Sequence, residues 1–147
     1  MSFASSMNSS TMTSSTDMHA DQGLLDTSIF IALETGRPLD TDRSPTNSSV
    51  SIITIGELRL GILTARDALT RSARLSTFLD ASELNPLPID ENVAEAWAQL
   101  RITLRDTKTK MSVNDSWIAA TAMAHNIPVV TQDGGFVEGL GFDIVRI

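Results

Sequence analysis

Apolar runs and helix-like patterns alternate along the chain from about Gly23 onward. Short apolar segments surround Leu24 and recur at residues 50–53, 127–131 and 142–147, several of them continuous, and each predicts a strand. The stretches between them repeat apolar positions every three or four residues, which is typical of helices with one packed face. The predicted helices cover residues 29–34, 54–64, 67–80, 91–106 and 114–125. This alternation predicts an α/β fold, a single domain with a central, mostly parallel sheet of about four or five strands flanked by helices.

The helix at residues 91–106 carries the clearest local signals. Asp90 is placed to cap its first turn, and Val93, Trp97, Leu100 and Leu104 form one apolar stripe along it. Earlier in the chain, Thr27 or Ser28 is a candidate cap for the first helix. Asn126 is placed to end the helix at residues 114–125. The segment at 84–89 holds two prolines, which confine it to a sheet edge or a connection.

The first 22 residues differ in composition from the rest of the chain. They are rich in Ser, Thr and Met, and they lack both the positive start and the apolar centre of a secretory signal. We therefore expect residues 1–22 to be a disordered leader and residues 23–147 to form the folded domain, with Met18 as an alternative start. No stretch has the length and apolar character of a membrane span, so we expect a cytoplasmic protein.

Composition narrows the chemistry that the chain can perform. The 147 residues contain no cysteine and only two histidines, His19 and His125. Disulfides, cysteine nucleophiles and thiolate metal sites are thereby excluded, and so is a zinc site built on several imidazoles. Any bound metal must be held by oxygen ligands. The net charge of −7 argues against a protein that coats nucleic acid non-specifically, but it does not exclude a nuclease whose bound cation offsets the acidity locally.

Four acidic residues stand where a predicted strand ends or a predicted helix begins. They are Asp26, Glu57, Asp115 and Asp133. In a parallel α/β sheet the functional residues lie beyond the carboxyl ends of the strands, so these acids are expected to converge there. Helix N-termini offset only about 0.3–1 kcal/mol of each negative charge. A shared divalent cation is therefore predicted, and an all-oxygen site suits Mg²⁺ or Mn²⁺.

Each acid also has an ordinary structural explanation. Asp26 can cap a helix, and Asp133 followed by Gly134 is a common turn pair. Glu57 fits a capping box that begins at Thr54, and Asp115 fits a weaker one that begins at Ser112. No single acid is diagnostic, so the inference depends on their order along the chain and on the residues around them.

Four local motifs, LLDTSIFIAL, TIGELRLG, NDSWIAATAMAH and VVTQDGGF, resemble the acidic motifs of PIN-domain ribonucleases, and most of all the VapC toxins of bacterial toxin–antitoxin pairs. The resemblance covers residues 23–147 in the order of the family. One departure is Gly135, because family members often carry a polar or acidic residue there. This departure predicts weaker metal binding at Asp133.

The resemblance implies an Mg²⁺-dependent endoribonuclease, with Mn²⁺ as an alternative cofactor, that cuts structured RNA of the tRNA or rRNA class and leaves a 5′-phosphate and a 3′-hydroxyl. The four acids would be the catalytic and metal-binding residues. It also implies a homodimer neutralised by a VapB-like antitoxin, with Arg59 as a candidate contact. The polar residues beside the acids are candidates to support them by hydrogen bonds: Thr27, Ser28, Asn114 and Thr131.

Basic residues gather in two stretches and are candidates for guiding the RNA backbone. The candidates are Arg59, Arg66, Arg101, Arg105, Lys108 and Lys110. Each stretch is also explained by a solvated helix face. Two other functions stay open: a metal- or RNA-binding module that lost catalysis, and a phosphoryl-transfer enzyme of another α/β class. The second is disfavoured because Ser28 replaces the second Asp that a D-x-D phosphatase motif needs.

Overall fold

A computed structural model describes residues 21–147 and contains a four-stranded parallel sheet. Its strands are β1 (Gln22–Leu25), β2 (Asn47–Val50), β3 (Val129–Thr131) and β4 (Ile144–Arg146), in the spatial order β2-β1-β3-β4. All three strand pairs are parallel. The predicted α/β fold with a central parallel sheet is therefore confirmed.

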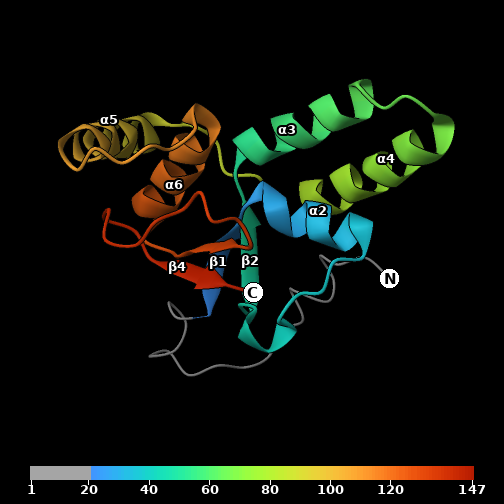
Figure 1. Cartoon of the computed structure of the whole chain (residues 1–147), viewed down its shortest axis with the longest axis horizontal. Helices are drawn as coiled ribbons and strands as arrows, with labels where there is room; N and C mark the ends of the chain where they lie inside the picture. The colour runs from blue at the N-terminus through green and yellow to red at the C-terminus, as the bar shows by residue number, and fades with distance from the viewer. Residues whose placement is uncertain (1–20) are drawn as a thin grey trace.

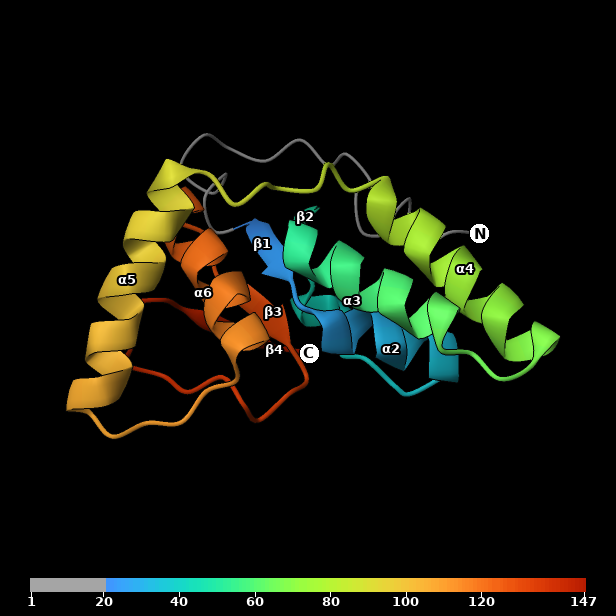
Figure 2. The same cartoon turned by 90° about the horizontal axis from the view of Figure 1, so that it is seen from above.

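Helices cover both faces of the sheet (Figures 1 and 2). They are α2 (Thr27–Thr35), α3 (Ile52–Leu63), α4 (Ala68–Ser82), α5 (Glu91–Asp106) and α6 (Val113–His125), with a short 3-10 turn, η1 (Thr41–Arg43), before β2. Figure 2 shows the strands between α5 and α6 on one side and α2, α3 and α4 on the other. None of the helices within residues 21–147 combines the length and apolar character needed to cross a membrane.

Successive residues of the central strands feed two separate apolar clusters. Leu25 and Val130 pack with α2, α3 and α4, whereas their neighbours Leu24 and Val129 pack with α5 and α6. Adjacent side chains on a strand point to opposite faces, so a strand buried on both faces must be apolar at every position. This is why the apolar runs of the sequence identify the central strands.

The predicted strand at residues 50–53 is wrong in its second half. β2 ends at Val50, and Ser51 caps α3 by accepting a hydrogen bond from the Ile53 backbone N–H at 3.1 Å. Ile52 and Ile53 therefore belong to the helix, which begins two residues before the predicted start at Thr54. A short apolar run does not distinguish the end of a strand from the start of a buried helix.

Other predicted boundaries hold to within a few residues. Asp90 caps α5 through the Val93 backbone N–H at 2.9 Å, and Asn126 ends α6 with a left-handed φ of 53°. The first described strand begins at Gln22, and residues 1–20 of the predicted leader lie outside the described residues. The segment at 84–89 contributes a single bridge from Leu87 beside β2, as expected for a sheet edge.

Candidate active site

The four acids lie around one edge of the sheet, where the parallel strands end. Asp26 directly follows β1 and Asp133 follows β3 after one intervening residue. Glu57 lies on α3, which leaves the end of β2, and Asp115 lies in the first turn of α6. Asp115 and Asp133 both raise the pKa of Asp26 by charge repulsion, and Glu57 acts in the same way on Asp115. The acids are therefore close enough to share one electrostatic environment.

Asp26 is the most buried of the four, with only 2% of its surface exposed. It occupies the N-cap position of α2, but its carboxylate makes no capping hydrogen bond. Instead, Oδ1 accepts a hydrogen bond from the Ser28 hydroxyl at 2.7 Å and Oδ2 accepts one from the Thr131 hydroxyl at 3.0 Å. Burial raises the pKa of Asp26 to about 6, and the two hydroxyls hold that increase back. Neither Thr27 nor Ser28 is the helix cap predicted from the sequence, because α2 begins at Thr27.

The same two hydroxyls attach the loop after β3 to Asp26. Ser28 Oγ accepts from the Gln132 backbone N–H at 3.0 Å, and Thr131 Oγ1 accepts from the Asp133 backbone N–H at 2.8 Å. Each hydroxyl thus donates to the buried carboxylate and accepts from the loop that carries Asp133. The positions of Asp26 and Asp133 are therefore coupled through two short side chains.

Glu57 is held from α2 rather than by its own helix. Its Oε1 accepts a hydrogen bond from the Thr27 hydroxyl at 2.7 Å, and Thr27 Oγ1 lies 3.0 Å from Thr54 Oγ1. The predicted capping box of Thr54 and Glu57 is wrong, because Ser51 is the cap and Thr54 lies inside α3. The earlier start of α3 also moves Glu57 from the first turn to the second, where the helix dipole helps its charge less.

Asp115 is half-buried and lies beside the loop that carries Asp133. Ser112 caps α6 by accepting from the Asp115 backbone N–H at 3.1 Å, which is the capping arrangement predicted here. Burial is the main cause that raises the pKa of Asp115; a hydrogen bond with Ser112 lowers it, and the charges of Asp133 and Glu57 raise it further. The small residues that follow are fully buried, which lets α6 pack closely on the sheet (Ala119, Ala120 and Ala122).

The acidic side chains do not display the predicted metal-binding geometry. Within residues 21–147, no three acidic or histidine side chains are arranged to hold one ion. The acids instead interact through charge and through the bridging hydroxyls described above. An Mg²⁺ ion typically keeps several waters and binds directly to only one or two carboxylates, so this arrangement can receive it without a closed cage.

Three of the four predicted supporting residues contact an acid directly, as described for Thr27, Ser28 and Thr131. The fourth, Asn114, lines a cavity of about 450 Å³ together with Thr27 and Glu57. All four polar residues therefore lie at the site.

Only some of the six predicted basic residues lie beside the acids. Arg101, Arg105 and Lys110 line a cavity of about 720 Å³ that also reaches Asp115. Lys108, two residues before Lys110, is absent from that lining and takes a left-handed φ of 54°. The remaining two lie elsewhere. Arg59 covers the ring of Phe78 at 5.6 Å, and Arg66 lies in the connection between α3 and α4, at the far end of that hairpin from the strands (Figure 1).

Sequence reasoning missed two residues that shape the site. Arg146, on β4, donates to the backbone oxygens of Asp133 at 2.8 Å and Phe136 at 2.6 Å, so it holds the loop after β3 in place. Gln132 donates from its side chain to the Pro38 backbone oxygen at 2.7 Å, which joins that loop to the segment after α2. A single Arg near the end of a chain and a Gln beside an Asp carry no sequence signal for these roles.

Comparison with known proteins gives a consistent result. The sequence signature described as the PIN domain matches residues 23–139. The chain is 42% identical over 128 residues to Ribonuclease VapC5 of Mycobacterium tuberculosis, a match that spans 85% of this chain and 95% of that protein. It is 44% identical over 131 residues to Ribonuclease VapC4 of the same organism, spanning 88% of this chain and 100% of that protein.

A solved structure shows the same architecture. It is a member of the VapBC family of toxin–antitoxin systems, VapBC-5, from Mycobacterium tuberculosis. The two folds agree with a TM-score of 0.80 at 36% identity, and the match covers 86% of this chain and 99% of the other.

Proposed function

Because this chain belongs to the PIN-domain family, and within it to the VapC group, we propose that it is an Mg²⁺-dependent endoribonuclease and the toxin of a toxin–antitoxin pair. The observation that carries the proposal is the convergence of the four acids where the parallel strands end, with Asp26 buried among them. Asp26 and Asp115 are both harder to ionise because of burial and because of the other acids. Acids forced together in this way gain most from a bound cation.

The donor set fits a hard divalent cation. Every side chain at the site that can ligate is an oxygen donor, which suits Mg²⁺ and also Mn²⁺. Asp26, Asp115 and Asp133 would hold the ion, since their charges act on one another most directly. When bound, the cation polarises the scissile phosphate and stabilises the negative charge that develops on it.

The protein side chains have separate tasks in this scheme. Ser28 and Thr131 fix the orientation of the Asp26 carboxylate and tie it to the loop that carries Asp133. Thr27 fixes the Glu57 carboxylate at 2.7 Å, so that Glu57 can accept a hydrogen bond from the attacking water and orient it. Hydroxyl donors suit this purpose because they position a carboxylate without neutralising it.

RNA of the tRNA or rRNA class is the proposed substrate. The support is that the relatives are named ribonucleases and that Arg101, Arg105 and Lys110 border the acidic site. RNA of defined shape presents its phosphates in a fixed arrangement, which a few cations beside a cleavage site can recognise.

A VapB-like antitoxin is the proposed partner, in a complex built on a homodimer of this chain. The cavity of about 450 Å³ beside Glu57 is lined mainly by residues of α2 and α3, and the apolar Ile31 and Leu60 on its wall are 44% and 60% exposed. An amphipathic segment with apolar side chains at helical spacing fits such a surface. Co-expression with the neighbouring reading frame should relieve growth arrest. If expression of the chain alone causes no growth arrest, the toxin assignment is wrong.

The catalytic proposal is tested with purified protein and a mixture of tRNA and rRNA. Cleavage is expected with Mg²⁺, should stop in EDTA, and should be lost in Asp26→Asn and Asp115→Asn. Asp42→Asn, which changes an exposed acid in η1, is the matched control and should cut at the wild-type rate. Cleavage that continues in EDTA would contradict the metal-dependent mechanism. A protein that binds RNA but cuts none would instead be a binding module.

A further inference from the structure

Gly135 lies beside the carboxylates of two of the acids, Asp115 and Asp133. A Cβ atom at this position would lie 3.2 Å from Asp115 Oδ2 and 3.4 Å from Asp133 Oδ1. The φ of Gly135 lies outside the left-handed region, so its backbone does not require glycine. What the glycine provides is space at a point where one methyl group would touch both carboxylates.

The same glycine borders the cavity of about 720 Å³ between α5 and α6. Arg101, Arg105 and Lys110 contribute three positive charges to its lining, and Asp115 lies in the lining with Gly135. The protein as a whole carries a net charge of −7, so this is a local concentration of positive charge beside the acidic site. A polyanion is attracted to such a surface, whereas most of the molecule repels it.

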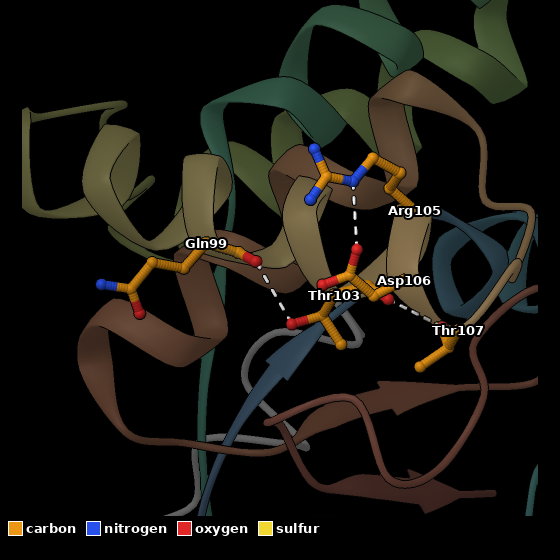
Figure 3. Close-up of polar contacts among 5 residues, drawn as sticks. All are labelled: Gln99, Thr103, Arg105, Asp106 and Thr107. Atoms are coloured by element: carbon orange, nitrogen blue, oxygen red, sulfur yellow. Dashed lines mark hydrogen bonds and ion pairs between the residues drawn. The ribbon is translucent and has the colours of Figure 1, made fainter.

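The cations of this cavity are free to bind another anion. Within residues 21–147, Arg105 forms an ion pair only with its neighbour Asp106 at 3.0 Å (Figure 3). The two side chains are 71% and 59% exposed. Such a surface ion pair contributes little, so a phosphate can replace Asp106 at small cost. Lys110 has no ion-pair partner within residues 21–147.

Arg101 is positioned by an aromatic stack. Its guanidinium lies 5.8 Å from the centre of the Trp97 ring, a cation–π distance. Trp97 stacks on Trp117 with ring centres 4.3 Å apart and donates from Nε1 to Ser116 Oγ at 3.0 Å. Trp97 thus holds the Arg101 guanidinium and is itself packed on α6, the helix that carries Asp115.

Resting on the ribonuclease function proposed above, we propose that Gly135 is a positioning residue for RNA. Phosphates of an RNA strand bind along Arg101, Arg105 and Lys110, and the open space at Gly135 lets the reacting phosphodiester reach Asp115 and Asp133. The cations supply affinity and the glycine supplies access. These two roles predict different kinetic effects.

The first test compares Gly135→Ala with Gly134→Ala on an oligoribonucleotide that the wild type cuts, at saturating Mg²⁺. Gly134 is the matched control, because a Cβ there would meet no atom within 4 Å. Gly135→Ala should lower kcat several-fold with KM nearly unchanged, because the Asp115 carboxylate must move by a few tenths of an ångström to admit the methyl group. Gly134→Ala should behave as the wild type. Equal kcat for the two variants would refute the role of Gly135 and leave the ribonuclease function intact, whereas an inactive wild type would refute both.

The second test is independent of catalysis. Arg101→Gln, Arg105→Gln and Lys110→Gln should each raise KM while leaving kcat largely unchanged. For a fluorescent RNA titrated in EDTA, each variant should reduce the slope of log affinity against log salt by about 0.7, the value for one phosphate contact on a single strand. The control is Arg43→Gln, in η1, which precedes β2 and so lies at the opposite edge of the sheet from the acids. Unchanged slopes in all three variants would overturn the proposal even if Gly135→Ala fails to fold.

Discussion

Replacing Asp26 with Asn should stabilise the protein at neutral pH when no metal is present. Asp26 is only 2% exposed, and burial raises its pKa from 3.8 to about 6. Ionisation of this carboxyl is therefore less favourable in the folded protein than in the unfolded chain. Asn has nearly the same shape and carries no charge, so it removes the cost of ionisation and leaves the packing intact.

The sign and the size of this stability difference follow from the coupling between proton binding and folding. Between pH 3.8 and about 6 the unfolded chain has released the Asp26 proton while the folded protein still holds it, so the free energy of unfolding falls as pH rises. Above about pH 6 the loss is complete. A pKa difference of about two units corresponds to about 3 kcal/mol, at 1.36 kcal/mol per unit. The advantage of Asp26→Asn should thus grow by about 2–2.5 kcal/mol between pH 4 and pH 7 and then level off.

Urea denaturation in EDTA at a series of pH values measures this quantity directly. The stacked pair of Trp97 and Trp117 gives a fluorescence signal that should change on unfolding. Taking the difference between variant and wild type at each pH cancels the titration of the other carboxyls and any constant change in hydrogen bonding. Asp42→Asn, which alters an exposed acid, is the control variant. A difference for Asp26→Asn that stays constant from pH 4 to pH 8 would refute the reasoning.

Three further outcomes are expected. Mg²⁺ at one hundred times its dissociation constant should raise the unfolding free energy of the wild type at pH 7.5 by about 2.7 kcal/mol, and that of Asp26→Asn by much less, as measured by urea denaturation. Gly23→Ala should destabilise the protein by about 1–3 kcal/mol, because its Cβ would lie 2.6 Å from a methyl group on β3. Gly56→Ala, in open space on α3, should instead stabilise it by about 1 kcal/mol. Equal changes in melting temperature for the two variants would contradict this. Trp97→Phe should cost about 1 kcal/mol through the lost hydrogen bond to the buried Ser116, and an unchanged urea midpoint would show that this bond contributes nothing.

Most of the fold could be predicted because the sheet is buried on both faces. The adjacent apolar residues Leu24 and Leu25 on β1 and Val129 and Val130 on β3, with amphipathic helices between strands, leave few arrangements other than a covered parallel sheet. The start of α3 could not be predicted in this way. The run that includes Ile52 and Ile53 suits either a strand or a buried helix, and the deciding contact is the capping hydrogen bond of Ser51.

The candidate site was predictable in its members but not in its contacts. The ends of parallel strands meet at one edge, so the order of the acids along the chain was enough to predict that Asp26 and Asp133 would be neighbours. The bonds that fix them join residues far apart in sequence, as Thr131 does with Asp26. Short-range pattern reading instead favoured a capping role for Glu57, which failed once α3 began two residues earlier.

The Asp26 carboxylate is bound by hydroxyl groups and not by a cationic side chain. This affects both the stability of the protein and its proposed metal binding. Among residues 21–147, Arg105 and Asp106 form the one ion pair, so no cationic side chain neutralises Asp26. An Arg beside Asp26 would lower the pKa of that carboxyl and strengthen the fold, but it would also cancel the negative charge that attracts a metal ion. Ser28 and Thr131 orient the carboxylate and leave the charge in place. Burial raises the pKa of Asp26, and the lack of a neutralising cation among residues 21–147 leaves its negative charge available to Mg²⁺. Asp26→Asn should therefore remove both the cost of ionisation and the proposed affinity for the ion.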